Sequence, residues 1–543
     1  MDQTKEVETD VLVIGGAIAG CSAAIKASQL GVKVTLAEKA AIGRCGCAPW
    51  GLDHIWWYFP GGDMSLDDVI DAHMERLCRK LGNRGVLTKM WKESFNRARD
   101  LENLGIEFKF NGKYHWRTHH HLGVYNSLIY AGHNLTSALA KEVTRCNVNV
   151  LNRTMITRLI VDRDAVIGAI GLNTRNGEFI VIKSKATILA TGGATRLYPS
   201  PTNRLFSTFA PPNDTGDGYS MAFRAGAQLI NMEFPMAHPT TKGFRPSSTG
   251  GFKNAGASVI DAYGNPLEAG IDRSETSRLH KKAFEAGRYP FYVDPTGISK
   301  EKYDEVCVTS IKNEVPMYFD FLQFKGFDYR RDIVEIEDHE WDLRDGRSGL
   351  LIEDDGRTSL EGLFAAGDCT GGVFDAESMG AIVIAWNAGE SAAQFAGKNV
   401  IFDIESNILE EEKKRIFNPL KLKEGVNWAD INMGLQKIMK EYAGEIRHSA
   451  GLERCIENIF DLREEYIPRL VAKDFHELMR CLEVQSLCDT AEMIARAALA
   501  RKESRFFHLR TDYPRTDDEN WLKFVVLERK PNGDIRIFLK APD

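Results

Sequence analysis

The order of apolar and polar positions near the start of the chain predicts a strand, a helix and a second strand. Residues 11–14 form an apolar run suited to a buried parallel strand, and glycines follow at Gly15, Gly16 and Gly20. A helical stretch of small and apolar residues comes next, and the segment 32–38, VKVTLAE, is typical of a second strand. This arrangement predicts a β-α-β unit of the Rossmann type.

The glycine turn of this unit predicts a dinucleotide site. Glycines there let the backbone approach a pyrophosphate at the start of the helix. Glu38 ends the second strand 23 residues after Gly15, close to the usual spacing of roughly 20 for an acid that holds a ribose. Ala17 replaces the second glycine of the G-x-G-x-x-G pattern. The alternative is a glycine-rich turn in an α/β domain that binds no ligand.

The same strand-then-glycine pattern returns at 184–194 and again at 348–372, far along the chain. Between them, short strand-like runs at 148–182 follow in the order of a meander, and an irregular stretch with several prolines comes later. The nucleotide-binding domain is therefore predicted to be discontinuous. We predict its first part at 1–230, an inserted domain at 231–347, its second part at 348–405 and a C-terminal helical domain at 425–543.

Charge and hydropathy narrow the classes of function. The chain of 543 residues has a net charge of −7, which gives no electrostatic case for binding nucleic acid or an anionic membrane surface. Residues 1–9 are polar and acidic, and no run of about 18 apolar residues occurs. We therefore expect no transmembrane segment, no nucleic-acid partner and a cytoplasmic location.

The ten cysteines show no C-x-x-C spacing, so we predict no metal site, neither zinc nor iron–sulfur. Cys45 and Cys47 are separated by one residue. Packing is their expected role and a redox role is the alternative. If the protein is a redox enzyme, it has no electron-transfer chain of its own.

Several motifs, in this order along nearly the whole chain, resemble the flavoprotein subunits of the succinate dehydrogenase and fumarate reductase family. That family also includes aspartate oxidase and the adenylylsulfate reductase alpha subunit, and the chain resembles a divergent branch near the latter. The resemblance implies an α/β fold, in which a discontinuous Rossmann-type FAD-binding domain is joined by an inserted capping domain and a C-terminal helical domain. The motifs are VLVIGGAIAG, GHNLTSAL, ATGGA, NDTGDGYSMAFRAGA, NMEF, HPT, GRTSLEGLFAAGD and ESRFFHLRTDYP.

The resemblance implies that the cofactor is FAD. Membrane-linked members attach FAD through a histidine, and Cys45 stands at that position here, so we expect noncovalent FAD, with a cysteinyl link as the alternative. In addition, a glycine beside Asp217 and another beside Asp368 permit close backbone approach, although turn chemistry also favours Asp next to Gly. The residues expected to bind FAD are Gly15, Gly16, Ala17, Ala19, Gly20, Glu38, Lys39, Arg44, Cys45, Gly51, Ile156, Ala190, Thr191, Gly192, Gly193, Asp217, Gly367, Asp368, Ile382 and Val383.

The resemblance also implies two catalytic residues. His238, in the HPT motif, matches a substrate-side histidine, and a structural imidazole between domains is its alternative role. Arg273 lies where the family places an arginine that donates a proton opposite flavin N5. Its alternative is an exposed arginine at a helix start, and Arg278 is a rival candidate for the catalytic role.

Other substrate-binding groups of the family are missing. Arg344 falls at the position of a family histidine, Ser378 replaces a clamping arginine, and the segment 247–257 lacks a glutamate and an arginine. Without these cations a dianion such as fumarate would bind poorly. We therefore expect an FAD-dependent oxidoreductase with a changed small substrate. A hydride would pass between this substrate and flavin N5, and electrons would pass between the flavin and a separate iron–sulfur or carrier protein. The alternatives are an adenylylsulfate reductase alpha-like protein and a flavin electron-transfer subunit without its own substrate.

Two aromatic and histidine-rich stretches have no clear assignment. The segment 49–62, PWGLDHIWWYFPGG, could cover the flavin or contact a flat substrate, or it could pack against a partner subunit or the capping domain. His119, His120 and His121 resemble a metal-binding tract, but three adjacent residues cannot all face one ion. A polar loop is therefore the expected role of these histidines.

Overall fold

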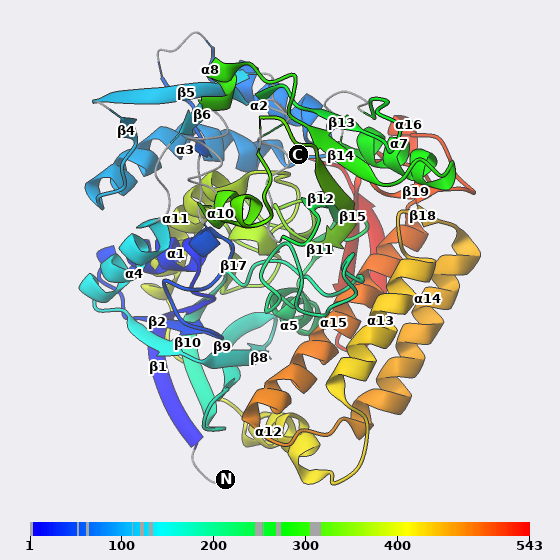
Figure 1. Cartoon of the computed structure of the whole chain (residues 1–543). Helices are drawn as coiled ribbons and strands as arrows, with labels where there is room; N and C mark the ends of the chain where they lie inside the picture. Colours follow the sequence, from blue (N-terminus) through cyan, green and yellow to red (C-terminus); the bar gives the residue numbers. More distant parts are fainter. Residues whose placement is uncertain are drawn as a thin grey trace.

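The computed structural model describes residues 4–50, 54–60, 64–110, 112–119, 124–129, 134–244, 252, 255–267, 273–304, 316–328 and 330–542. These residues form an α/β structure with an added helical bundle (Figure 1).

A seven-stranded sheet contains the predicted β-α-β unit. Its strand order is β7-β2-β1-β10-β9-β8, and β17 also pairs with β10. Strand β1 (Thr4–Ile14) pairs in parallel with β2 (Val34–Glu38) and with β10 (Phe179–Leu189). Its apolar residues at 11–14 are buried, as expected for a parallel strand covered on both faces. The other strands are β7 (Asn149–Asn152), β8 (Thr154–Asp162), β9 (Ala165–Asn173) and β17 (Leu363–Ala365).

Two details of this sheet bear on the sequence predictions. Strand β17 pairs in parallel with β10 although it lies far along the chain, so the discontinuous domain is confirmed, while the exact boundaries of the four segments stay predictions. Only β8, β9 and β10 form the meander, with antiparallel pairing. Strand β7 instead pairs in parallel with β2, so its assignment to the meander was wrong.

Two helices pack closely against each other beside the sheet. Helix α1 (Ile18–Gln29) follows β1, and helix α11 (Glu377–Ala396) follows β17. A Cβ atom on Gly389 of α11 would lie 2.4 Å from the carbonyl oxygen of Ala23 on α1. The glycine therefore allows the two helix backbones to approach, which fixes both helices relative to the strand ends that they follow.

The predicted capping domain contains a separate four-stranded sheet with the order β12-β15-β14-β13, drawn in green in the upper part of Figure 1. It has its own apolar core, which includes Tyr318, Leu322 and Ile336. Where β15 ends, Leu343 exchanges two backbone hydrogen bonds with Ala194, which joins this unit to the main sheet. The elements are β12 (Met236–Thr241), β13 (Ser258–Ile260), β14 (Phe291–Asp294), β15 (Val334–Asp342), α7 (Arg273–Glu285), α8 (Lys300–Lys302) and α10 (Pro316–Phe324).

Part of the aromatic segment 49–62 is in the core. Trp56 and Trp57 are each about 1% exposed, and the Trp56 ring stacks on that of Trp91 at 6.1 Å between centroids. Packing is therefore the role of these two tryptophans. Trp56 ends β3, in a small sheet with the order β3-β6-β5-β4. The elements here are β3 (His54–Trp56), β4 (Lys109–Phe110), β5 (Lys113–His119), β6 (Val124–Ile129), α2 (Leu66–Arg76) and α3 (Arg84–Asn103). His120 and His121 lie outside the described residues.

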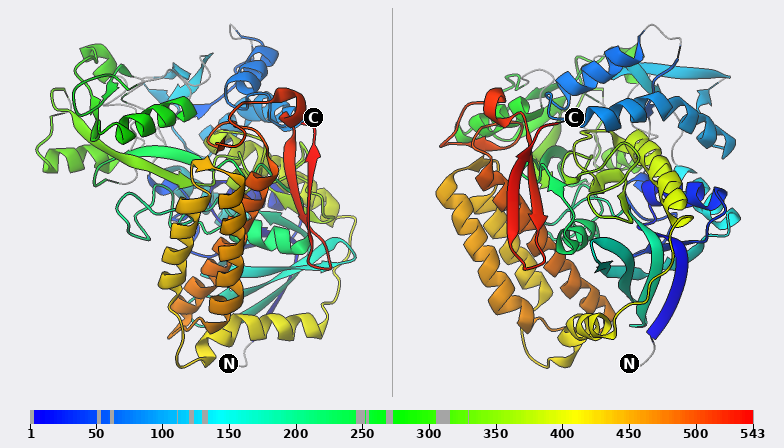
Figure 2. Two further views of the ribbon diagram at one scale, coloured as in Figure 1. Left: turned by 90° about the vertical axis from the view of Figure 1, so that its right-hand side faces the viewer. Right: turned by 180° about the vertical axis from the view of Figure 1, so that it is seen from behind.

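The C-terminal part is largely helical, as predicted. Helices α13, α14 and α15 lie side by side in both views of Figure 2, and a terminal hairpin of β20 and β21 pairs through β20 with β11. The elements are α12 (Ser406–Lys421), α13 (Trp428–Tyr442), α14 (Ser449–Asp461), α15 (Phe475–Ala500), β20 (Phe524–Arg529) and β21 (Ile535–Lys540), with β11 (Leu229–Ile230) and β16 (Gly349–Leu350) completing the sheet.

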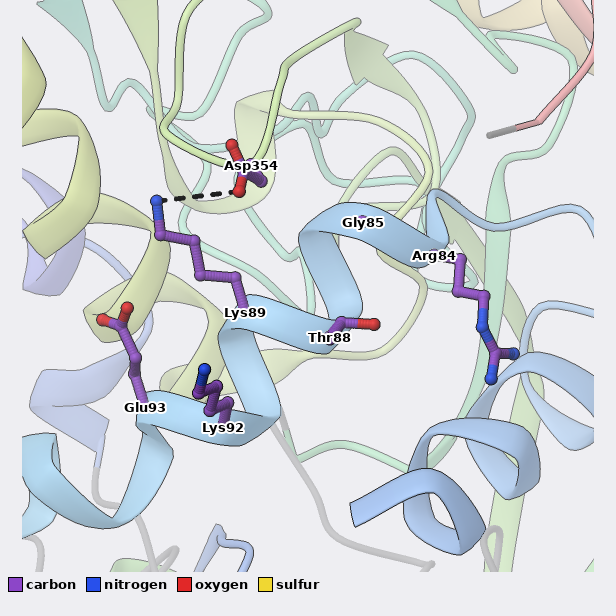
Figure 3. A pocket seen from close by; sticks show the side chains of 7 residues that line it. All are labelled: Arg84, Gly85, Thr88, Lys89, Lys92, Glu93 and Asp354. Carbon is purple, nitrogen blue, oxygen red and sulfur yellow. Dashed lines mark ion pairs between the residues drawn. The ribbon is translucent and has the colours of Figure 1, made fainter.

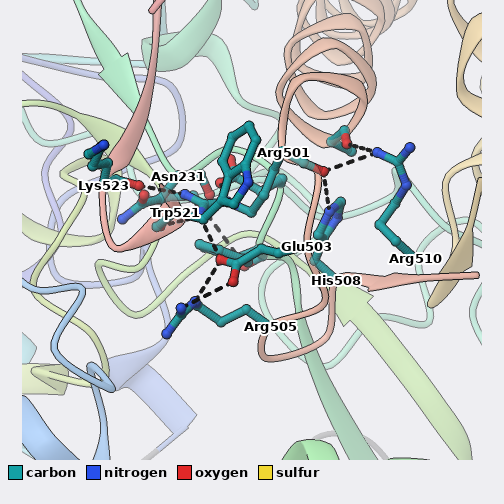
Figure 4. Close-up of polar contacts among 12 residues, drawn as sticks. Asn231, Arg501, Glu503, Arg505, His508, Arg510, Trp521 and Lys523 are labelled. Atoms are coloured by element: carbon teal, nitrogen blue, oxygen red, sulfur yellow. Dashed lines mark hydrogen bonds and ion pairs between the residues drawn. The ribbon is translucent and has the colours of Figure 1, made fainter. Parts of the chain in front are cut away.

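A buried polar cluster holds the segment after α15 in place (Figure 4). Arg501 is fully buried and donates to Glu233 at 2.5 Å and to Glu503 at 2.9 Å. His508 is also fully buried, between Arg447 at 2.9 Å and the Arg501 carbonyl at 3.2 Å. Buried charges are tolerated when they are paired and hydrogen-bonded. The ESRFFHLRTDYP motif is thus a structural anchor between the C-terminal part and the NMEF segment.

Candidate functional site

The polar and glycine residues predicted to bind a dinucleotide converge at the carboxyl ends of the parallel strands. Gly15 and Gly16 follow β1, Glu38 ends β2, residues 190–193 follow β10, and residues 367–368 follow β17. In open α/β sheets, ligands bind outside these strand ends. This edge of the sheet is the candidate site (Figure 1).

Glycines make this edge compact. A Cβ on Gly15, whose φ is +103°, would lie 2.1 Å from the carbonyl oxygen of Ala190, and one on Gly20 would lie 1.8 Å from that of Gly15. Ala17 is the N-cap of α1 and its side chain makes no capping hydrogen bond. A Cβ on Gly46 would lie 2.6 Å from the Ala17 Cβ. Glycine at position 46 thus gives room for the methyl group that departs from the glycine pattern.

The Glu38 carboxylate closes the turn. Its two oxygens accept hydrogen bonds of 2.6 Å from the Gly16 and Ala40 backbone N–H groups, and the side chain is buried. The start of β8 lies nearby, because the Arg153 N–H donates to the Ala40 carbonyl. Glu38 is therefore held at the strand end beside the glycine turn, and its contact with a ribose stays a prediction.

A buried ionic network adjoins this end. The Lys39 ammonium lies 2.7 Å from Asp217 and 3.1 Å from Glu483 of α15. Glu483 is fully buried and also pairs with Arg196 at 2.8 Å and Arg480 at 2.7 Å. Burial raises the pKa of the Glu483 carboxyl, but the three cations outweigh this effect and hold the pKa at about 2. No local sequence pattern pointed to Glu483, because its partners Lys39 and Arg196 are far away along the chain.

Several half-buried or exposed polar residues belong to the inner part of the candidate site: Cys47, Thr191, Asp214, Arg344 and Asp368. A Cβ on Gly192 would lie 3.2 Å from the Asp214 carboxylate. Burial, with help from Asp368, raises the pKa of Asp214 well above its usual range, and burial also raises the pKa of Asp368. The sequence prediction did not include Asp214, because in this segment the cofactor-binding role was assigned to Asp217.

Arg344 links this inner group of polar residues to the capping unit. Its Nε lies 3.2 Å from Asp342, and its guanidinium stacks over Phe209 at 4.3 Å. Burial raises the pKa of Asp342 to about 8, although Arg344 lowers it. Ser378, near the start of α11, is buried. At positions 344 and 378 we expected the family's substrate-binding side chains to be missing. The side chain present at position 344, an arginine, contacts Asp342.

The remaining predicted site residues fall into groups. Ala19 is buried on α1, where a Cβ on Gly367 would approach its own Cβ to 2.9 Å. Ile156 is buried on β8, and Ile382 and Val383 are buried on α11. Arg44 is exposed, and Gly51 lies outside the described residues.

The two expected catalytic residues lie in the capping unit. His238 is on β12, paired with Glu340 of β15, and Arg273 begins α7. The side chains of these two residues lie outside the described part of the structure. The rival Arg278 lies further along α7, half-buried. Of the segment 247–257, only residues 252 and 255–257 lie in the described part.

A recess on α3 is separate from these strand ends (Figure 3). It is lined by exposed or half-buried residues, and its lysine Lys89 lies 3.8 Å from Asp354. Arg84 pairs with Asp71 at 2.7 Å. Paired surface charges of this kind do not form a built binding site. Its lining residues are Arg84, Gly85, Thr88, Lys89, Lys92, Glu93 and Asp354.

Comparisons with known proteins identify the fold. The profile of the FAD binding domain family matches residues 10–384, and that of the fumarate reductase flavoprotein C-terminal family matches residues 432–541. The chain is therefore an FAD-dependent oxidoreductase. It belongs to the family of the succinate dehydrogenase and fumarate reductase flavoprotein subunits.

Individual relatives match over most of their length. One of the subunits of fumarate reductase (CoM/CoB) from Methanothermobacter marburgensis is 28% identical, over 97% of this chain and 98% of that protein. L-aspartate oxidase from Mycobacterium leprae is 27% identical, over 95% of each. The structure of adenylylsulfate reductase from Archaeoglobus fulgidus has a TM-score of 0.89 and 25% identity, covering 99% of this chain and 96% of that one.

The described residues fit FAD as the cofactor. The glycines at 15, 16 and 20 let the strand end, the turn and the start of α1 pack closely, and the acid at position 38 stands at the adjacent strand end. Every helix in the described part of the chain is too short or too polar to cross a lipid bilayer.

Proposed function

We propose that the protein reduces or oxidises a small unsaturated substrate other than a dicarboxylate. When bound, FAD supplies a hydride acceptor or donor at N5. The observation that supports a changed substrate is the state of Arg344: the guanidinium is paired with Asp342 at 3.2 Å and stacked on Phe209. These contacts hold the guanidinium against groups of the protein, and serine at 378 removes another cation, so the described residues here offer less positive charge for binding a dianion.

The proposed cofactor site follows the strand ends. Gly15, Gly16, Ala17 and Gly20 would hold the pyrophosphate at the start of α1, and Glu38 would hold the ribose. The other residues predicted from the sequence extend the site from this end, past residues 190–193, toward Gly367 and Asp368 and the capping unit. Noncovalent attachment remains our proposal, because no histidine stands at position 45.

Two residues of the capping unit are proposed to handle substrate. A hydride delivered to one carbon must be matched by a proton at its neighbour, and we assign this proton to Arg273. His238 would orient the substrate. In Arg273→Ala we expect FAD to stay bound while turnover is lost, and Arg278→Ala serves as the control on the same helix. Full turnover in Arg273→Ala, with Arg278→Ala inactive, would transfer the role to Arg278.

Electrons are proposed to pass through a separate iron–sulfur or carrier protein. The cysteines of the chain show no iron–sulfur spacing, and the relative from Methanothermobacter marburgensis is named as one subunit of its enzyme. A purified reduced ferredoxin-type protein should therefore reduce the bound flavin in the absence of oxygen. If only small-molecule reductants do so, the separate carrier is not required.

A second candidate is an activity like that of adenylylsulfate reductase, favoured by the TM-score of 0.89 to that enzyme. The two candidates are separated by adding adenylylsulfate, crotonate or cinnamate to the anaerobically reduced protein. Reoxidation by an unsaturated acid supports hydride transfer to carbon, and reoxidation by adenylylsulfate supports the second candidate. If none reacts while a strong chemical oxidant does, a flavin electron-transfer subunit is favoured.

A further inference from the structure

The last strand of the chain, β21, leaves one edge of its sheet open (red in Figure 2). It is terminal in the order β16-β11-β20-β21, and among the described residues no strand pairs with its outer edge. Its register with β20 is regular, without a bulge, and its sequence, IRIFLK, contains no proline. Bulges and prolines are common protections of such an edge, because the free N–H and C=O groups can otherwise pair with another strand.

The hairpin turn shows which backbone groups point to the open edge. The Lys530 N–H donates to the Asp534 carbonyl at 2.8 Å, so these two residues form a hydrogen-bonded pair. Along an antiparallel ladder, such pairs alternate with pairs that are not hydrogen-bonded. The even-numbered residues of β21 therefore bond to β20, and the N–H and C=O groups of Ile535, Ile537 and Leu539 point outward.

The side chains of the strand divide into an apolar face and a charged face. On the apolar face, Ile537 is 36% exposed, Leu539 is 42% exposed and Ile535 is half-buried. On the charged face, Asp534 precedes the strand and Lys540 ends it. Neither of these two charges forms an ion pair in the part of the chain that the structure describes, although Asn532 donates to the Asp534 carboxylate at 2.7 Å.

The sequence of β21 is complementary to itself. Two copies related by a two-fold axis pair antiparallel, and in a continuous sheet the same face of each strand lies on the same side. With Ile537 opposite its own copy, Ile535 lies opposite Leu539 of the other chain. The apolar face then continues across the junction, and the outward-pointing N–H and C=O groups of these residues all find partners.

Charge selects this register over its neighbours. Asp534 of each copy then lies opposite Lys540 of the other, which supplies the ion pair that both charges lack within one chain. Arg536 lies opposite Phe538 of the other copy, and within one chain its guanidinium already lies 4.5 Å from that ring. Moving the two-fold axis to position 536 or 538 would set Arg536 opposite its own copy or opposite Lys540, and like charges in these positions are destabilising.

We propose that the open edge of β21 pairs with the same edge of a second copy of the chain, in the register centred on Ile537, to form a symmetric dimer. The two sheets join into one continuous sheet across the axis. The paired edge is short, so we expect a reversible dimer that forms as the protein concentration rises. The inference does not depend on the substrate or on the electron carrier.

The first experiment measures the mass of the FAD-loaded chain by sedimentation at increasing protein concentration. We expect the mass to rise from that of one chain to that of two. Asp534→Lys should raise the dissociation constant roughly tenfold or more, because both ion pairs become repulsive. Adding Lys540→Asp to this variant exchanges the charges and should restore the dimer. The control is Glu457→Lys on α14, which makes the same change of net charge at an exposed position and should leave association unchanged.

The second experiment tests the register with cysteines. Ile537→Cys places two thiols opposite each other in the dimer, at the Cα separation of about 5.5 Å of a hydrogen-bonded pair, which a disulfide can span. Diamide takes up the two hydrogen atoms that the thiols lose as the S–S bond forms, and a covalent dimer should appear on a nonreducing gel. Ile535→Cys, which lies opposite Leu539, should give no covalent dimer beyond that of the wild-type chain, whose own cysteines set the background.

A mass of one chain at every concentration would overturn the proposal. A dimer that Asp534→Lys leaves intact would use another surface and would overturn it as well. Equal cross-linking of Ile535→Cys and Ile537→Cys would refute the register. If circular dichroism shows that Asp534→Lys is unfolded, the charge-exchanged variant and Ile537→Cys still decide: loss of association in the first, or no cross-link in the second, would overturn the proposal.

Discussion

Replacing Glu483 by glutamine tests whether the C-terminal helix α15 supports the cofactor site. The carboxylate is fully buried and lies within 3.1 Å of Lys39, 2.8 Å of Arg196 and 2.7 Å of Arg480. Glutamine keeps the size of the side chain but removes its charge, so Lys39 would keep only Asp217 as an acidic partner, and Arg196 and Arg480 would lose the carboxylate with which they pair. Breaking a buried ion pair by removing one partner costs about 3–5 kcal/mol, and we expect Glu483→Gln to lower the free energy of unfolding by that amount.

The assay is urea unfolding, followed by circular dichroism and by release of flavin fluorescence. Glu457→Gln is the matched control, because Glu457 is exposed and pairs with Arg454 only on the surface, where such pairs contribute little. FAD should also dissociate more readily from Glu483→Gln, because Lys39 and Asp217 adjoin the proposed cofactor site. A Glu483→Gln midpoint equal to that of Glu457→Gln would refute the reasoning.

The same variant predicts a change in pH dependence. The pKa of Glu483 is lowered from 4.5 to about 2 in the folded protein. A depressed pKa stabilises the fold above the ordinary value, and this stability is lost as the pH falls through the folded value. The wild-type protein should therefore lose stability between these two pH values more steeply than Glu483→Gln. Parallel pH profiles of the two proteins would contradict the assignment.

Two further predictions concern the junction with the capping unit. Gly193→Ala would place a Cβ 1.8 Å from the Leu343 carbonyl oxygen, so the strand end must move. We expect this variant to have a lower FAD content and a lower melting temperature. The control is Gly434→Ala, which has no atom within 4 Å of its Cβ and should be neutral or slightly stabilising. A normal FAD content in Gly193→Ala would argue against this junction. The pKa of Asp342 is raised from 3.8 to about 8. Between these two pH values the folded protein holds a proton that the unfolded chain releases. The free energy of unfolding should therefore fall with rising pH by up to about 1.4 kcal/mol per pH unit. Asp342→Asn should flatten this dependence, measured as melting temperature against pH, and an unchanged slope would show that another group titrates.

Local sequence patterns predicted the nucleotide-binding edge of the sheet well. Features that depend on contacts between distant parts of the chain could not be predicted in this way. The β1-α1-β2 unit is continuous in sequence, so its apolar run, its glycines and Glu38 could be recognised directly. Strand β7 was misplaced because its partner, β2, is distant in the chain, and nothing in a single strand specifies its neighbour. Glu483 was missed for the same reason.

The aromatic segment shows a second kind of limit. Trp56 and Trp57 fit either a flavin cover or a core by composition alone, and only their burial against Trp91 and neighbouring rings decides for the core.

The most direct test of a changed substrate is the reaction of the reduced protein with fumarate. The purified FAD-loaded protein is photoreduced without oxygen, fumarate is added, and the oxidised flavin spectrum is followed. We predict no reoxidation by fumarate, with full recovery of the spectrum by a strong chemical oxidant. Rapid reoxidation by fumarate would contradict the account and make the protein a divergent fumarate reductase, in which Arg344 and Ser378 still permit a dicarboxylate to bind.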